Sequence, residues 1–574
     1  MFVDKELIKK GTWQSFERLI CRLVMAEGFD GARVVGQSND HGADIVASRN
    51  GVRWVFQAKH WNKPIGVDVI DETIKAAQNY KAKIPVIVSS NGFDQKAREH
   101  QRLLLMNGVP LQLWDVNTLI EHADRLPDTV PNQNKPREYQ EEAIEGIVNS
   151  FLNQSNRALA VMATGLGKTF VAAESVKRIS SIVSNMRVLV LAHTNPLVYQ
   201  LERSFWKFMK KDQTSIVWNG YEEPGISDIE KADYVFACIN TVSDYIKRNE
   251  SFPFFDVIVV DECHHAGSSM YKNLLDFTLA GKKNGPFLLG LTATPWRPDE
   301  TDLNEIFGET VVCIDMVDGL KKGFLSNVDY RMYTDNINWD SLKNLNGQTF
   351  TPKQINRTLF IEQWDDSVVY ELKKAWSEQP NPRAIVFCGT VDHANIMCSK
   401  LNALGFCNAA AIFSSSGSGY SLNQYEKNRI LTDFADGIIN VVCTVDIFNE
   451  GIDVPDVNIL VFQRVTHSRR IFIQQLGRGL RISDNKDKVI VLDFVSDIRR
   501  FAAGLELKDG LNKGTPKTTR ITLPNKVTFK KITGDDPETE KFLRIWLDDI
   551  AEIEASGENS SVLKFPPVLP ESKM

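Results

Sequence analysis

The chain has 574 residues, of which 43% are hydrophobic and 24% charged, and its formal net charge is −6. This composition excludes a disordered or fibrous chain, and the length predicts about four domains at roughly 150 residues each. No apolar run approaches the roughly 20 residues of a membrane-spanning helix, and the start of the chain lacks the apolar core of a signal peptide.

The 8 cysteines are scattered singly, without a Cys-x-x-Cys pair, so neither a zinc ribbon nor a disulfide framework is indicated. A reducing cytoplasm is the expected compartment, and no membrane partner is expected. The acidic net charge gives by itself no indication of a nucleic-acid partner.

Helices alternate with short strands over residues 1–125, and this pattern predicts a compact α/β domain. The next stretch, 126–136, contains three prolines and several Asn and Asp residues, which predicts a linker. Helices are expected near 12–27, 68–80 and 94–106, and strands near 45–47, 54–58, 84–88 and 109–114.

Short apolar runs separated by helical stretches recur after the linker, and they predict two parallel sheets covered by helices. The first sheet is expected within 137–328 and the second within 383–497. The more polar interval 329–382 is interpreted as a connecting insertion, and 498–574 as a helical C-terminal tail. The predicted fold class is α/β throughout.

A glycine-rich turn follows the first apolar run of the first unit, in Ala163-Thr-Gly-Leu-Gly-Lys-Thr169. Gly165 and Gly167 let backbone N–H groups approach a phosphate. Lys168 can reach the β- and γ-phosphates, and the Thr169 hydroxyl is a ligand for Mg²⁺. Met162 stands where a plain phosphate-binding loop has Gly. An ordinary turn before a helix is the alternative for this segment alone.

A second motif strengthens the nucleotide interpretation, because Asp261 and Glu262 follow the apolar run 257–260. Ligands of open α/β sheets bind at this end of the strands. Asp261 is suited to hold Mg²⁺, and Glu262 to polarise the attacking water. An acidic pair at this place is also common as a helix cap. It supports a nucleotide site because it lies about 90 residues after the phosphate-binding loop. The sequence predicts an ATP site.

These motifs resemble those of superfamily 2 helicases, which have two RecA-like lobes, over about residues 136–497. The resemblance implies that Gln140 reads adenine and that Asp453, in Glu450-Gly-Ile-Asp453, belongs to the nucleotide-binding set. It also implies that Arg478 and Arg481, in Gln474-Gln-Leu-Gly-Arg-Gly-Leu-Arg481, reach across the cleft as arginine fingers. His264 would couple the nucleotide to the nucleic acid.

The N-terminal domain carries a second set of polar residues, Asp44, Gln57 and Lys59. Gln57 and Lys59 are two positions apart, so on a strand they project to one face, and a hairpin across 48–51 would bring that face beside Asp44. A carboxylate and an amide oxygen can hold Mg²⁺, which activates water toward a phosphodiester, and Lys59 can stabilise charge. The alternative is a solvent-facing polar hairpin.

The surrounding segments, in order along about residues 1–125, resemble the Mrr-like branch of restriction endonucleases. This branch often has Gln at the position of Gln57. The resemblance implies that Asp44 and Gln57 hold the metal, and that Glu17 on the first helix is an additional acidic residue near it. A solvent-facing Glu17 is the alternative.

The combined expectation is an ATP-dependent DNA helicase or translocase coupled to a Mg²⁺-dependent endonuclease, in prokaryotic restriction or anti-phage defence. Its cofactors would be ATP and Mg²⁺, and its partners double-stranded DNA and subunits of a defence system. One alternative is a DNA-stimulated motor or sensor ATPase whose N-terminal domain binds DNA without cutting it. A second is a motor that acts on RNA.

Overall fold

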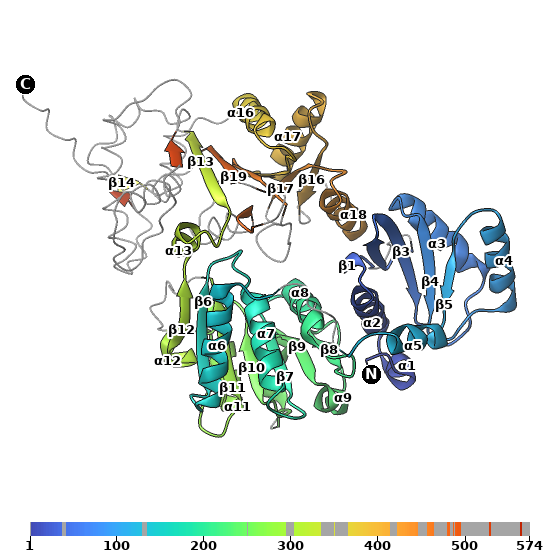
Figure 1. The fold of residues 1–574 in the computed structure, drawn as a ribbon, viewed down its shortest axis with the longest axis horizontal. Coiled ribbons are helices and arrows are strands. Elements are labelled where there is room, and N and C mark those ends of the chain that lie inside the picture. Colours follow the sequence, from blue (N-terminus) through green and yellow to red (C-terminus); the bar gives the residue numbers. More distant parts are fainter. Residues whose placement is uncertain are drawn as a thin grey trace, which may run out of the picture.

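Over its described residues, the computed structural model contains a five-stranded sheet and two seven-stranded sheets, each covered by helices (Figure 1), and a separate two-stranded sheet. The predicted fold class, an N-terminal α/β domain followed by two parallel-sheet lobes, is confirmed. The residues that the structure describes are 2–36, 42–128, 135–249, 251–293, 303–333, 349–350, 365–413, 422–445, 456–463, 479–482, 486, 488–494, 527–529 and 563–564.

The N-terminal domain has the strand order β1-β2-β3-β4-β5, with β1, β2 and β3 antiparallel and β3, β4 and β5 parallel. Helix α2 covers one face, where Phe16 packs in the same buried cluster as Phe56. Helix α3 covers the other face, where Ala76 packs with Val55. The elements are α1 (Lys5–Lys10), α2 (Trp13–Ala26), β1 (Asp30–Val34), β2 (Ile45–Arg49), β3 (Val52–Lys59), α3 (Val67–Asn79), β4 (Ile84–Ser89), α4 (Gln95–Met106), β5 (Gln112–Trp114) and α5 (Val116–Asp124).

Lobe 1 is a parallel sheet in the order β12-β6-β11-β10-β7-β9-β8. Its central strands are apolar and wholly buried, as expected when helices cover both faces of a sheet. The strands are β6 (Arg157–Met162), β7 (Val188–Ala192), β8 (Ser215–Trp218), β9 (Tyr234–Cys238), β10 (Val257–Val260), β11 (Phe287–Thr292) and β12 (Thr310–Ile314). The helices are α6 (Glu138–Leu152), α7 (Lys168–Ser180), α8 (Asn195–Phe205), α9 (Ile226–Lys231), α10 (Ile239–Arg248), α11 (Ser269–Thr278), α12 (Leu303–Phe307) and α13 (Met316–Lys321), with 3-10 turns η1 (Trp206–Phe208) and η2 (Cys263–His265).

Lobe 2 is a parallel sheet in the order β16-β17-β15-β18-β19-β13-β20. Most of its strands alternate with helices along the chain, as in lobe 1. The strands are β13 (Asn327–Tyr333), β15 (Ala384–Phe387), β16 (Ala409–Phe413), β17 (Val441–Val445), β18 (Ile459–Phe462), β19 (Lys488–Phe494) and β20 (Val527–Phe529). The helices are α16 (Asp365–Ser377), α17 (Val391–Ala403) and α18 (Gln424–Ala435).

Two predicted boundaries are wrong where the structure describes the chain. The interval 329–382 is not only a connecting insertion, because β13 pairs with β19 in the sheet of lobe 2 and α16 packs on that sheet. The range 498–574 is not wholly helical, because β20 pairs with β13 and β21 (Leu563–Lys564) pairs with β14 (Thr349–Phe350). These pairings join segments distant along the chain, which local periodicity does not reveal. The rest of the range 498–574 lies outside the described residues.

The N-terminal domain packs on lobe 1 through a buried ion cluster. Arg18 on α2 pairs with Glu202 at 2.8 Å and with Glu222, and all three side chains are at most 9% exposed. Burial lowers the pKa of Arg18, but the two carboxylates outweigh it and hold the pKa above its ordinary value. Because breaking such a pair leaves a charge buried without its partner, this cluster fixes the domain to lobe 1.

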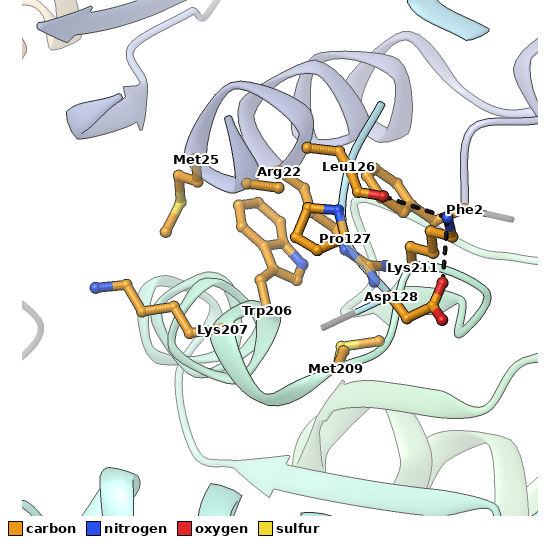
Figure 2. Close-up of a pocket in the computed structure, with 11 residues that line it drawn as sticks. Phe2, Arg22, Met25, Leu126, Pro127, Asp128, Trp206, Lys207, Met209 and Lys211 are labelled. Atoms are coloured by element: carbon orange, nitrogen blue, oxygen red, sulfur yellow. Dashed lines mark hydrogen bonds and ion pairs between the residues drawn. The ribbon is translucent and has the colours of Figure 1, made fainter. Parts of the chain in front are cut away.

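A small pocket lies at the same seam, between α2, the chain after α5 and η1 (Figure 2). Arg22 crosses the seam and donates hydrogen bonds of 2.9 Å to the carbonyls of Lys210 and Gln213. Lys211 Nζ lies 3.1 Å from Asp128 Oδ1 and donates to the Leu126 carbonyl at 3.2 Å. Arg22 and Lys211 therefore join the two domains across this pocket.

The N-terminal domain also contacts lobe 2, where helix α18 lies beside β1 (Figure 1). Asn428 on α18 donates a 2.7 Å hydrogen bond to the Val35 carbonyl. Arg53 on β3 pairs with Asp433 at 3.4 Å and with Asp436. The domain therefore touches both lobes, and a change in the lobe spacing must alter at least one of these two contacts.

Candidate active sites

The phosphate-binding loop connects β6 to α7 in lobe 1. Gly165 and Gly167 have φ angles of 95° and 86°, which favour glycine. A Cβ atom at Gly167 would lie only 2.7 Å from Gln140 Nε2, so a side chain at this position would displace Gln140. Lys168 and Thr169 occupy the first turn of α7, whose N-terminus is suited to an anion. The four predicted loop residues are brought together at one helix end.

Gln140, the predicted adenine contact, is buried against this loop. Its Nε2 donates to the Leu166 carbonyl at 2.9 Å, and its Oε1 accepts from Arg137 N at 3.0 Å. Tyr139 donates its hydroxyl to the same Leu166 carbonyl at 3.2 Å. The start of α6 is thus tied to the loop, which places Gln140 at the nucleotide site. Its contact with adenine stays a prediction.

The acidic pair follows β10, a central strand of the sheet. Lys168 Nζ lies 3.8 Å from Glu262 Oε1, which joins the acidic motif to the phosphate-binding loop. Burial and, to a smaller extent, the neighbouring Glu262 raise the pKa of Asp261 to about 7, although Lys168 acts to lower it. A dication would stabilise the charged form of this carboxylate. Asp261 and Thr169 therefore fit the Mg²⁺ that accompanies ATP.

Glu262 is held in an uncommon conformation, with φ of 46° and ψ of 48°. Residues in such conformations are concentrated at functional sites, where the surrounding structure stabilises them. His264 Nδ1 lies 3.3 Å from Glu262 Oε2 and 3.1 Å from Thr292 Oγ1, at the end of β11. His264 thus links the proposed water-polarising carboxylate to the next loop of the sheet, and its coupling role stays a prediction.

The site residues expected from lobe 2 are only partly described. Asp453 and Arg478 lie outside the described residues. Arg481 is described, and its carbonyl accepts a 2.9 Å hydrogen bond from the hydroxyl of Ser326, which directly precedes β13. This places the backbone of Arg481 where the chain passes from lobe 1 to lobe 2. The finger role of both arginines stays a prediction.

The second candidate site is built on the predicted hairpin of the N-terminal domain. Strands β2 and β3 pair antiparallel with Ile45 opposite Phe56, so Asp44 faces Gln57. Directly opposed residues share a face of the sheet. Asp44 Oδ2 also accepts a 2.6 Å hydrogen bond from the N–H of Ala58, between Gln57 and Lys59. The three predicted residues therefore lie together.

Glu17 is buried at 5% exposure and is not solvent-facing. A Cβ atom at Gly36 would lie 2.8 Å from Asp44 Oδ1 and 3.1 Å from Glu17 Oε2. The two carboxylates therefore approach the same point beside the Gly36 backbone, and any larger residue there would obstruct them. Helix α2 brings Glu17 to this point from the opposite face of the sheet to α3.

The remaining wall of this site comes from α3, which the sequence did not assign to it. Glu72 Oε2 lies 3.5 Å from Lys59 Nζ. Thr73 is fully buried and hydrogen-bonded to Gln57 through its hydroxyl. A Cβ atom at Gly42 would lie 2.9 Å from Gln57 Nε2 and 2.7 Å from Glu72 Cγ. The spacing of Glu72 and Thr73 on an amphipathic helix gave no signal for this role.

The side chains present fit a hard cation. Two buried carboxylates, Asp44 and Glu17, converge beside a buried amide, and oxygen atoms of these kinds are preferred by Mg²⁺. Among the residues that the structure describes, no three His, Cys, Asp or Glu side chains form a metal-binding group. A cation here would therefore complete its shell with water, as Mg²⁺ usually does.

Comparisons with known proteins divide the chain in the same way. Residues 8–123 match the family described as restriction endonuclease. Residues 133–297 match the family described as type III restriction enzyme, res subunit, and residues 366–483 match the helicase conserved C-terminal domain. The first match covers Asp44, Gln57 and Lys59, and the other two cover most of lobe 1 and lobe 2.

Similar whole proteins include putative ATP-dependent helicases, such as the mitochondrial helicase irc3 of Schizosaccharomyces pombe (28% identical over 64% of this chain and 58% of that protein), and subunits of restriction enzymes. The type I restriction enzyme EcoAI endonuclease subunit of Escherichia coli is 27% identical over 433 residues, which are 71% of this chain and 50% of that protein. The EcoKI endonuclease subunit of Escherichia coli K12 is 26% identical over 456 residues, covering 70% of this chain and 38% of that protein. The chain spans about half the length, or less, of these relatives.

A solved structure shares the fold over most of the chain. The ATP-dependent type ISP restriction-modification enzyme LlaBIII bound to DNA aligns with a TM-score of 0.53 and 18% identity, over 96% of this chain and 42% of that one. Among the described helices of this chain, none is both long and apolar enough to cross a bilayer.

Proposed function

Because this chain is a superfamily 2 helicase with an N-terminal Mrr-like restriction endonuclease domain, we propose that it cuts DNA with Mg²⁺ while its lobes move along the DNA at the expense of ATP. Restriction or anti-phage defence is the proposed setting, with double-stranded DNA as the substrate. The similarity to subunits of type I restriction enzymes supports partner subunits as a further part of the proposal.

In lobe 1, the chain's own residues perform the positioning that ATP hydrolysis needs. Lys168 and the N-terminus of α7 bind the phosphates, and Glu262 orients the attacking water. Asp261 and Thr169 would hold Mg²⁺, whose contribution there would be to neutralise phosphate charge. Arg478 and Arg481 of lobe 2 complete the site when the lobes close, so hydrolysis follows lobe closure.

In the N-terminal domain, Asp44, Gln57 and Glu17 would hold Mg²⁺, whose chemistry there would be to polarise the phosphodiester and to activate water at neutral pH. Lys59 lies on the same strand as Gln57 and stabilises negative charge near the attacked phosphorus. The Ala58 N–H bond to Asp44 keeps the two strands in register, so the carboxylate and the lysine stay on one side of the hairpin.

The observation that carries the proposal is the convergence of Asp44, Glu17 and Gln57 in a domain that touches both motor lobes. One contact is the buried Arg18 cluster on lobe 1, and the other is the α18 contact on lobe 2. Lobe closure then changes how the nuclease domain is held. This arrangement supports cutting that depends on the nucleotide state of the motor.

The test uses supercoiled plasmid with Mg²⁺ and ATP. Asp44→Ala and Lys59→Ala are expected to lose nicking while retaining DNA-stimulated ATP hydrolysis. The matched control is Asp124→Ala, which removes an exposed carboxylate of α5 in the same domain. A parent protein that hydrolyses ATP on DNA but never nicks it would refute the nuclease assignment and favour a DNA-binding N-terminal domain.

A second experiment compares the stimulation of ATP hydrolysis by duplex DNA, single-stranded DNA and RNA, and so identifies the nucleic acid along which the lobes move. Greater stimulation by RNA would contradict DNA as the substrate.

A further inference from the structure

The side-chain amide of Gln57 has different surroundings at its two ends. On one side is the hydroxyl of Thr73, and on the other are Gly42 and Glu72. Gln57 is fully buried, so both ends of its amide need a partner inside the protein or in a bound ligand. With Oε1 toward Thr73, the buried Nε2 has no hydrogen-bond partner among the described residues.

The chemistry of the Thr73 hydroxyl favours the opposite orientation. A hydroxyl has one proton and two acceptor positions. Thr73 Oγ1 lies 2.7 Å from the Val69 carbonyl, one turn earlier on α3, and can give it this proton. Toward Gln57 the hydroxyl then acts as an acceptor, so the atom facing it must be the donor Nε2.

Turning the amide removes the unpartnered N–H group and moves the carbonyl oxygen to the side of Gly42 and Glu72. Oε1 is then a buried acceptor at the end of the hairpin that carries Asp44. A carbonyl oxygen binds a hard cation, whereas an NH₂ group in the same position repels it. The orientation of one amide therefore decides whether Gln57 is a ligand.

We propose that Thr73 is a positioning residue, which accepts a hydrogen bond from Gln57 Nε2 and so turns Oε1 toward the divalent cation of the nuclease site. This role rests on the proposed nuclease function. Thr73 itself does not touch the cation or the DNA. Outer partners of this kind typically change metal affinity by about 10–100-fold when they are removed.

The test compares Thr73→Val with Thr73→Ser. Valine keeps the shape but removes the acceptor, and serine keeps the hydroxyl. Binding of Mn²⁺ to the full chain without nucleotide, measured by titration calorimetry, is expected to weaken about tenfold in Thr73→Val and to change less than about twofold in Thr73→Ser. Asp44→Ala identifies which part of the Mn²⁺ signal belongs to this site. Equal Mn²⁺ affinity in folded Thr73→Val and parent would overturn the proposal.

A second arm uses Gln57→Glu, because a carboxylate presents oxygen in either orientation. In the Gln57→Glu background, Thr73→Val is expected to cause no further loss of Mn²⁺ affinity, so the two changes are not additive. An undiminished tenfold loss in this background would show that Thr73 acts only through packing. If Thr73→Val does not fold, Thr73→Ala is compared in the same two backgrounds.

The Mn²⁺ titrations distinguish an incorrect role for Thr73 from an incorrect assignment of the nuclease site. If Asp44→Ala leaves Mn²⁺ binding unchanged, the cation site itself is absent and the positioning role falls with it. If Asp44→Ala abolishes binding while Thr73→Val binds Mn²⁺ as the parent does, only the role of Thr73 is refuted.

Discussion

Arg53, on the central strand β3 of the N-terminal domain, forms an ion pair with Asp436 at the C-terminal end of α18 in lobe 2. These residues are 383 positions apart in the chain. Arg53 also donates a 2.5 Å hydrogen bond to the Tyr80 carbonyl, so it is anchored within its own domain. The pair therefore connects the sheet of the N-terminal domain directly to lobe 2.

We expect Asp436→Arg to uncouple nicking from the nucleotide state. The substitution places a like charge opposite Arg53, so the contact with lobe 2 opens while both active sites stay intact. The ratio of nicking with ATP to nicking without nucleotide is expected to fall about tenfold, which corresponds to about 1.4 kcal/mol. ATP hydrolysis should change less than about twofold.

Plasmid nicking and phosphate release measured on the same samples check this prediction. The control is Asp392→Arg, which reverses an exposed charge on α17 of the same lobe. An unchanged ratio in Asp436→Arg would show that the contact with α18 does not transmit the nucleotide state.

Removal of the charge at Arg18 should destabilise the seam with lobe 1. Arg18→Met leaves Glu202 and Glu222 buried without their cation, and breaking a buried pair in this way costs about 3–5 kcal/mol. A lower urea midpoint of unfolding, followed by tryptophan fluorescence, is the expected result. Lys10→Met, which removes a lysine that is 72% exposed, serves as the control. Equal midpoints for Arg18→Met and the control would contradict the stabilising role.

Lys168→Ala should abolish ATP hydrolysis, because the β- and γ-phosphates lose their fixed cation. Glu262→Gln should bind ATP but hydrolyse it at least about 100-fold more slowly, since the amide cannot act as the water-polarising carboxylate. Steady-state phosphate release checks both variants, with Lys177→Ala on the same helix as the control. Persistent turnover in Lys168→Ala would show that the phosphate-binding loop is misplaced.

Arg478→Ala and Arg481→Ala should leave nucleotide binding nearly intact and remove most hydrolysis. An arginine supplied from a second lobe contributes about 10³–10⁵ in rate while adding little to ground-state binding. Fluorescent nucleotide titration and single-turnover hydrolysis separate the two effects. Lys373→Ala, at an exposed position of α16, is the control. A large loss of binding in either arginine variant would argue against the finger role.

Most residues of both candidate sites could be predicted from short segments of the sequence. Gly165 to Thr169 are contiguous, and a strand followed by a helix N-terminus brings them together without distant partners. Gln57 and Lys59 share a strand, and a short hairpin suffices to bring Asp44 opposite Gln57. These arrangements follow from the alternation of side chains along a strand and from the short spacing of the residues in the sequence.

Other features depend on contacts between distant segments, which spacing does not encode. Arg18 meets Glu222 across 204 positions, and β13 joins a sheet whose other strands begin some 50 residues later. Thr73 looks like any buried position of an amphipathic helix until the amide of Gln57 is seen beside it. The net charge of −6 gave no indication of DNA, because contacts with phosphate depend on local grooves and not on the whole chain.

The most direct test of a nuclease governed by an ATP-driven motor is cleavage of supercoiled duplex plasmid with Mg²⁺ and ATP, a non-hydrolysable ATP analogue, or no nucleotide. We predict efficient cleavage only with ATP, its loss in Asp44→Ala, and its reduction to the level without nucleotide in Lys168→Ala. Cleavage at one rate in all three conditions would contradict the coupling. Absence of cleavage in all three, with DNA-stimulated ATP hydrolysis intact, would contradict the nuclease itself.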